Sequence, residues 1–180
     1  MTKRNCFTLV LLAMLFAAPG LTAYLYYRNP QWLSANTTNK GQLLNPPVLL
    51  SEVEDGKQKW RFVLWYPQHC ETQCLQEADK LARVRLALGR HLYEVDQWLL
   101  LHEDSLAMEN TATQMLREHD IHVAHISENS LKNLSILADK PQVFIASPKG
   151  DLVLAYEENT NPKDIYHDIK RLLGSEKKSG

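Results

Sequence analysis

The sequence has few cysteines and no excess of charge of either sign, and each shortage excludes a class of protein. Three cysteines in 180 residues are too few for a fold that is held together by disulfides. Twenty basic side chains are balanced by twenty-one acidic ones, and the Trp and Tyr residues are not interleaved with a basic stripe. The chain therefore lacks the features of a nucleic-acid-binding protein.

The first 28 residues contain a long uncharged run that follows two positive residues. Lys3 and Arg4 precede the run, and no residue in 6–27 is charged. As a helix this run would be about 33 Å long, which suffices to cross a bilayer. Positive residues before a span keep the N-terminus in the cytoplasm. We therefore expect residues 1–28 to form a cytoplasmic tip and a single transmembrane helix.

A cleaved signal peptide is the alternative for this segment, because Ala18-Pro-Gly20 is a passable cleavage site. Both alternatives export the rest of the chain. We expect a domain that is tethered to a bacterial inner membrane and faces the periplasm, an oxidising compartment in which thiols and disulfides interconvert.

Composition divides the exported part into three segments. Residues 29–46 are rich in Ser, Asn, Thr, Gly and Pro and are expected to be a linker, 47–174 a domain and 175–180 a polar tail. Within the domain, apolar patterning and turn signals predict a strand pair around Asp55-Gly56 (48–53 and 59–66), a helix (71–91), a strand (97–102), a helix (110–119), a strand (121–126), a hairpin (142–146 and 151–156) and a final helix (162–174).

The most informative motif is Cys70-Glu-Thr-Gln-Cys74, which lies between the predicted strand 60–66 and the helix after it. A helix N-terminus stabilises a thiolate, and two sulfurs there can exchange electrons or hold Cu(I). Helical residues four apart hold their β-carbons about 5–6 Å apart, whereas a disulfide needs about 3.5–4.5 Å. Redox chemistry therefore requires Cys70 to lie before the helix. Two inert apolar thiols or a structural disulfide are the alternatives.

The element order is that of a thioredoxin-like domain, a mixed α/β sheet flanked by helices. Residues 45–174 resemble the Sco/SenC group of membrane-anchored copper and thiol proteins that act in cytochrome c oxidase assembly. The likeness rests on the N-terminal span, on the Cys70–Cys74 spacing after an apolar strand, and on Phe144-Ile-Ala-Ser-Pro-Lys-Gly-Asp-Leu-Val153. That last segment is similar to the group's strand–Asp-Pro-x-Gly–strand hairpin, with Ser147 in place of Asp.

Two positions depart from the Sco pattern. Leu75 stands where the group has a proline after its second cysteine. The group's copper-binding histidine precedes the late hairpin, and the corresponding Ala138-Asp-Lys-Pro141 contains no histidine. A site of two thiolates and that imidazole therefore does not carry over intact, and the chain resembles a degenerate Sco relative.

Three other residues are candidates for the site. His69 adjoins Cys70 and could stabilise a thiolate or ligate a metal. His125 is the candidate ligand on the strand 121–126, where His122 should point to the opposite face. Both histidines are also consistent with plain surface positions. Pro141 matches the place where thioredoxin-like domains carry a cis-proline that faces the cysteines.

Three functions are consistent with these features. The first is a role in cytochrome c oxidase assembly through thiol:disulfide chemistry or Cu(I) handling at Cys70 and Cys74, with an oxidase subunit or another thiol protein as partner. The second is a general membrane-tethered thiol reductase, an oxidoreductase without copper. The third is a non-catalytic thioredoxin-like scaffold that binds a membrane partner.

Overall fold

The computed structural model describes residues 3–28, 38–53, 56–105, 110–134, 136–137 and 140–176. The chain forms two compact units, residues 1–38 and 39–180. The first unit contains one long helix, α1 (Lys3–Arg28), over the segment for which the sequence predicts a membrane span. Among the residues with a described structure, no helix combines the length and the apolar character that crossing a membrane requires.

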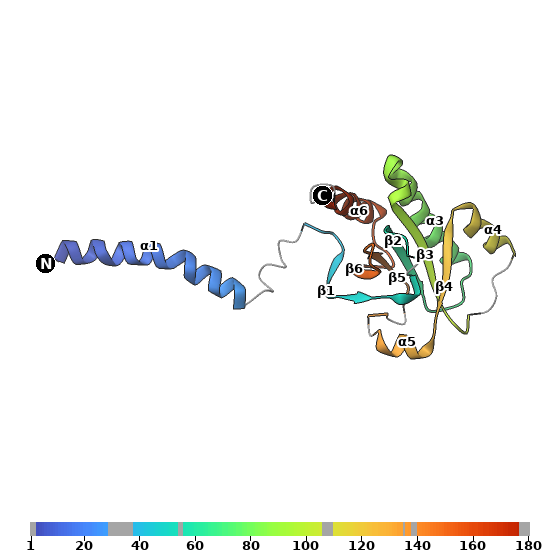
Figure 1. Ribbon diagram of the computed structural model, residues 1–180, viewed down its shortest axis with the longest axis horizontal. Helices are drawn as coiled ribbons and strands as arrows, with labels where there is room; N and C mark the ends of the chain where they lie inside the picture. The colour runs from blue at the N-terminus through green and yellow to red at the C-terminus, as the bar shows by residue number, and fades with distance from the viewer. Residues whose placement is uncertain are drawn as a thin grey trace. The chain divides into compact units, whose positions relative to one another are not determined.

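The second unit is built on a six-stranded mixed sheet, as the sequence predicts (Figure 1). The strand order is β1-β6-β5-β2-β3-β4. Strands β2, β3 and β4 are parallel to one another, whereas β5 runs antiparallel to β2 and to β6, and β6 runs antiparallel to β1. The bounds are β1 Gln42–Leu49, β2 Trp60–Tyr66, β3 Val95–His102, β4 Ile121–Ile126, β5 Gln142–Ala146 and β6 Asp151–Glu157.

The three most apolar strands, β5, β2 and β3, lie next to one another inside the sheet. A strand that is buried on both faces reads as a continuous apolar run, and β2 is buried at every residue except Trp60. Each face has its own core. Phe62 and Leu64 of β2 join the core under α3 and α6, whereas Val63 and Trp65 join a second core on the other face.

The helices cover these two cores. The bounds are α3 Thr72–Ala87, α4 Asn110–Glu118, α5 Glu128–Asn133 and α6 Pro162–Glu176, with short 3-10 helices η1 (Ser51–Val53) and η2 (Gly89–Glu94). The helix predicted for 71–91 ends at Ala87, because Gly89, the first residue of η2, takes a left-handed conformation (φ +58°). The sequence reading missed α5.

The predicted hairpin between 48–53 and 59–66 is wrong. Strand β1 pairs with β6 instead, and 51–53 is a 3-10 helix. Both edges of β2 are occupied by β3 and β5, so β1 is left with the outer edge of the sheet. The expected turn residues 54 and 55 lie outside the described residues. Since β1 begins at Gln42, the segment expected to be a linker also contributes its last residues to the sheet.

A buried carboxylate ties the start of β1 to α6. Asp168 is only 2% exposed. Its Oδ2 accepts hydrogen bonds from the backbone N–H groups of Lys40 (2.7 Å) and Gly41 (2.9 Å) and from the Tyr156 hydroxyl (2.8 Å). Burial opposes the charged form, but these bonds and one from His167 outweigh it and hold the pKa of Asp168 below its ordinary value.

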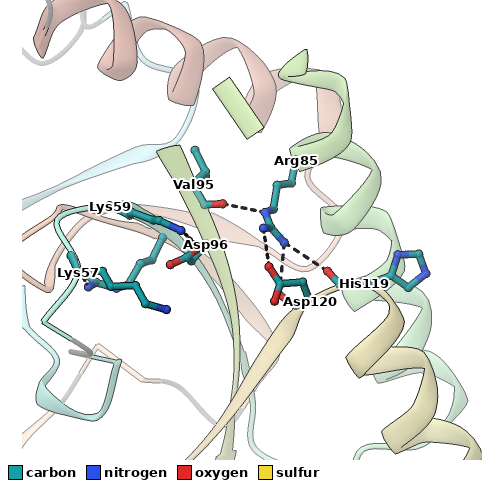
Figure 2. Close-up of polar contacts among 8 residues, drawn as sticks. Lys57, Lys59, Arg85, Val95, Asp96, His119 and Asp120 are labelled. Atoms are coloured by element: carbon teal, nitrogen blue, oxygen red, sulfur yellow. Dashed lines mark hydrogen bonds and ion pairs between the residues drawn. The ribbon is translucent and has the colours of Figure 1, made fainter. Parts of the chain in front are cut away.

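A buried arginine, Arg85, also connects segments that are far apart in the sequence (Figure 2). Arg85 of α3 is 6% exposed. Its Nε donates to the Val95 carbonyl (2.7 Å), and its terminal nitrogens donate to the His119 carbonyl and to the Asp120 carboxylate (2.9 Å). The hydrogen bond from Arg85 lowers the pKa of Asp120. Arg85 thus joins α3, the start of β3 and the turn between α4 and β4.

We predict that Arg85→Met lowers the free energy of unfolding by about 2 kcal/mol, because the carbonyl oxygens that it satisfies lose a charged donor. The matched control is Arg83→Met on the same helix. Arg83 is 76% exposed and pairs with Asp79 on its own helix, so its loss should cost about 0.5 kcal/mol or less. Urea titration of both variants measures the difference, and equal losses would contradict this account of Arg85.

Candidate redox site

The two cysteines of the motif form a disulfide at the junction of β2 and α3. Cys70 lies in the loop that follows β2, and Glu71 precedes the helix with an extended backbone (φ −104°, ψ −160°). The Cα atoms of Cys70 and Cys74 are 5.1 Å apart. Cys70 therefore lies before the helix. Two cysteines four residues apart can form a disulfide only in this arrangement, because inside a helix their β-carbons would be too far apart.

The two sulfurs differ in burial. Cys74 is fully buried, whereas Cys70 is half-buried and packs against the same core. Although the motif stands at the turn between strand and helix, Cys74 is part of the core and is not exposed. Cys74, Ala78 and Leu81 recur at helical spacing and form the face of α3 that packs on the sheet. Only Cys70 is therefore placed to meet another protein's thiol.

Carboxylates surround the disulfide end of the sheet. Tyr66, the last residue of β2, is buried, and its pKa is raised by that burial and then by the charges of Glu158, Glu71 and Glu77. Gln73 in the first turn of α3 donates a hydrogen bond to Glu158 (2.6 Å). This bond fixes the loop after β6 against the cysteine turn. Sequence reading missed Gln73 and Glu158, since no local pattern links residues so far apart in the chain.

The histidine candidates do not join the cysteines in one cluster. His69 is exposed and adjoins Cys70, and His125 is exposed on β4, which β3 separates from β2. His122 packs beside Trp98 with ring centroids 4.9 Å apart. Within the described ranges, no group of three or more His, Cys, Asp or Glu side chains is placed to hold a metal. While its two sulfurs are bonded to each other, the pair has no thiolate to donate to a copper ion.

The expectation of a cis-proline at Pro141 is wrong. Across the described residues, the one cis peptide bond joins Asn45 to Pro46. Pro141 directly precedes β5 with the ordinary trans bond, which X–Pro bonds in folded proteins prefer by about 0.5–1 kcal/mol. Of the Sco-related segment 138–141, residues 138 and 139 lie outside the described part of the chain. Leu75, in the place of the Sco proline, packs against the core beside Cys74.

Solved structures of Sco proteins share this fold. The apo Sco1 protein of Thermus thermophilus has a TM-score of 0.55 and 14% identity, with 77% of this chain and 99% of that chain covered. Copper-bound ScoI of Arabidopsis thaliana has a TM-score of 0.51 and 14% identity (66% and 86% covered). Copper-bound yeast Sco1 has a TM-score of 0.50 and 16% identity (65% and 79% covered). The domain therefore has a Sco-like thioredoxin fold.

Two further comparisons concern the sequence itself. The search of the curated proteins gave no match. Residues 60–175, from the first residue of β2 almost to the end of α6, match the family described as transmembrane-like, thioredoxin-like, C-terminal domain. Because the match spans more than half of the chain and contains the whole disulfide site, the protein belongs to this family of thioredoxin-like domains.

Proposed function

We propose that the domain exchanges thiols and disulfides with a client protein through Cys70 and Cys74. The observation that carries the proposal is the asymmetric disulfide at the start of α3, with one half-buried sulfur and one fully buried sulfur. The thioredoxin-like fold supports it, because the disulfide stands at the strand-to-helix turn, where a helix N-terminus favours a thiolate.

The exchange consists of two displacements. A client thiolate attacks Sγ of Cys70, the Cys70–Cys74 bond breaks, and Cys74 leaves as a thiolate. A second client thiolate then attacks the client sulfur of the mixed disulfide, and Cys70 leaves as a thiolate. The client dithiol loses two electrons and two protons, and the protein gains two thiols. The reverse sequence reduces a client disulfide, and the relative potentials of the two pairs set the direction.

In vitro, a small dithiol should reduce the disulfide of the full-length protein. The same small molecule in its oxidised, disulfide form should then restore the Cys70–Cys74 bond. Labelling of free thiols followed by mass determination counts the thiols at each stage. The double variant Cys70→Ala/Cys74→Ala should show no exchange. The proposal would be contradicted if the disulfide of the folded wild-type protein is not reduced at dithiol concentrations that reduce thioredoxin-like proteins.

The cellular setting is also a proposal. It places the domain in the periplasm of a bacterium, where a disulfide persists, with a role in cytochrome c oxidase assembly as the Sco resemblance implies. A phosphatase reporter fused after Gly180 should then be active, and a cytosolic reporter there should be silent. Carbonate extraction of membranes separates an anchored form from a cleaved one.

The oxidase part of the proposal needs its own test. Deletion of the gene should lower the oxidase content measured from haem absorption, and the wild-type gene should restore it. The double cysteine variant should fail to restore it. Normal oxidase with full export would limit the function to general thiol exchange, and restoration by the double variant would favour the scaffold alternative.

Cu(I) handling by the reduced pair is the second candidate. It is favoured by the copper-bound Sco structures of Arabidopsis thaliana and yeast, which share the fold. The thiolates of Cys70 and Cys74 would be the donors, with His69 as the imidazole to test, since His125 lies on β4, which β3 separates from β2. Reduced protein should retain one equivalent of Cu(I) in competition with a chromophoric chelator, and oxidised protein none. Equal retention by the double cysteine variant would exclude this candidate.

A further inference from the structure

A groove with an apolar floor lies between α3 and α6. Its volume is about 390 Å³, within the range of roughly 300–1,000 Å³ that is typical of binding pockets. The floor is formed by Val84 and Ala87 of α3 and by Pro162 and Tyr166 of α6. Val84 is buried and Ala87 is exposed, so the small alanine leaves the floor open to solvent.

The rim of the groove is basic. Lys80, Arg83 and Lys163 complete the lining, which contains no acidic residue. A fourth cation, Lys170, lies with its Nζ 5.5 Å from the centroid of the Tyr166 ring. Lys80 and Arg83 form ion pairs within α3, but their side chains remain 44% and 76% exposed. Such surface pairs exchange partners at little cost, so the rim complements a negatively charged ligand.

The groove and the disulfide share one helix, and Figure 1 shows α6 beside α3. Glu77, Val84 and Ala87 follow one another at spacings that place them on one side of α3, and the buried Cys74 precedes Glu77 by three residues, just under one turn. Val84 is ten residues beyond Cys74, which corresponds to about 15 Å along the helix axis. An extended peptide covers that distance with about five residues.

We propose that this groove binds the client of the Cys70–Cys74 pair through a segment in which a bulky apolar side chain is flanked by carboxylates. The inference rests on the proposed thiol exchange and names the class of client. The apolar side chain fills the floor formed by Val84, Ala87 and Tyr166, and the carboxylates meet Arg83 and Lys163. A client cysteine about five residues away then reaches Cys70.

The test uses two labelled peptides that each carry a cysteine, a spacer of about five Gly and Ser residues and a three-residue end. The acidic peptide ends in Glu-Phe-Glu and the basic peptide in Lys-Phe-Lys. Binding to the full-length double variant Cys70→Ala/Cys74→Ala is measured by fluorescence anisotropy, so that no covalent bond contributes. Exchange is measured separately with the wild-type protein.

The acidic peptide should bind and react about tenfold better than the basic one, since its two carboxylates are attracted to the positive rim whereas the two ammonium groups of the basic peptide are repelled by it. The double reversal Arg83→Glu/Lys163→Glu should invert this preference and leave exchange with a small dithiol unchanged. Ala87→Trp should abolish binding by filling the floor. The matched control Lys132→Glu/Lys149→Glu reverses two exposed lysines outside the groove lining and should change nothing.

The outcomes separate this inference from the function on which it rests. Normal exchange without a preference between the two peptides would overturn the groove proposal and leave thiol exchange standing. Loss of exchange with the small dithiol in the wild type would instead overturn the proposed function. Self-association that Ala87→Trp abolishes would show that a second copy of the chain occupies the groove, and would also overturn the proposal.

Discussion

The variant Cys74→Ala should accumulate a mixed disulfide with its client on Cys70, and Cys70→Ala should accumulate none. The half-buried Cys70 is open to another protein's thiol, whereas the fully buried Cys74 is not. Without Cys74, the neighbouring thiol that would resolve the bond between Cys70 and the client is missing. Non-reducing electrophoresis of cells that express each full-length variant, followed by mass spectrometry, measures the adducts.

Alanine is the better replacement at position 74, because a serine hydroxyl in the core beside Ala78 and Leu81 would lack water and cost about 1–3 kcal/mol. Thermal unfolding of both variants is the control that excludes misfolding as the cause of a missing adduct. Equal trapping by the two variants would contradict the assignment of Cys70 as the sulfur that bonds to the client.

The variant Asp168→Ala should lose about 3–5 kcal/mol of stability, because the backbone N–H groups of Lys40 and Gly41 and the Tyr156 hydroxyl lose a charged acceptor. A loss of this size is a large share of the roughly 5–15 kcal/mol that stabilises a typical domain. Tyr156→Phe removes a single donor and should cost about 1 kcal/mol. Denaturant unfolding gives both values, and a loss at Asp168 no greater than at Tyr156 would contradict the role of Asp168 in joining β1 to α6.

The contribution of Asp168 should also depend on pH. Its pKa is lower in the folded state than in the unfolded chain, where an aspartate has a pKa of about 3.9. The unfolded state therefore takes up the proton first as the pH falls. The stability difference between the wild type and Asp168→Asn should be constant above the unfolded pKa and should disappear as the pH falls through the folded pKa. A difference that persists in stronger acid would contradict the assignment.

Local patterns predict most of the fold. The apolar runs at β2, β3 and β5 indicate central strands, and the hairpin of β5 and β6 follows from its Ser147-Pro-Lys-Gly150 turn. Pairing between distant segments is what the sequence conceals. Residues 48–53 read as half of a hairpin with 59–66, but the actual strand β1 spans Gln42–Leu49 and pairs with β6, because β3 and β5 occupy both edges of β2.

The candidate site shows the same division. Spacing predicts the position of Cys70 before the helix, and the repeat of Cys74, Ala78 and Leu81 at helical spacing is the sequence signal for the burial of Cys74. The bond between Gln73 and Glu158 joins α3 to a loop far along the chain, so no local rule finds it. A cis bond at Pro141 was expected by analogy alone.

Equilibrium titration of the Cys70–Cys74 pair against glutathione redox buffers tests the central claim most directly. Alkylation of free thiols and mass determination give the reduced fraction at each potential, and near-ultraviolet circular dichroism reports the folded state. We predict a reversible two-electron transition, 29.6 mV per tenfold change in the equilibrium constant, in a protein that stays folded throughout. A disulfide that is reduced only together with unfolding would mark a structural crosslink and contradict the account.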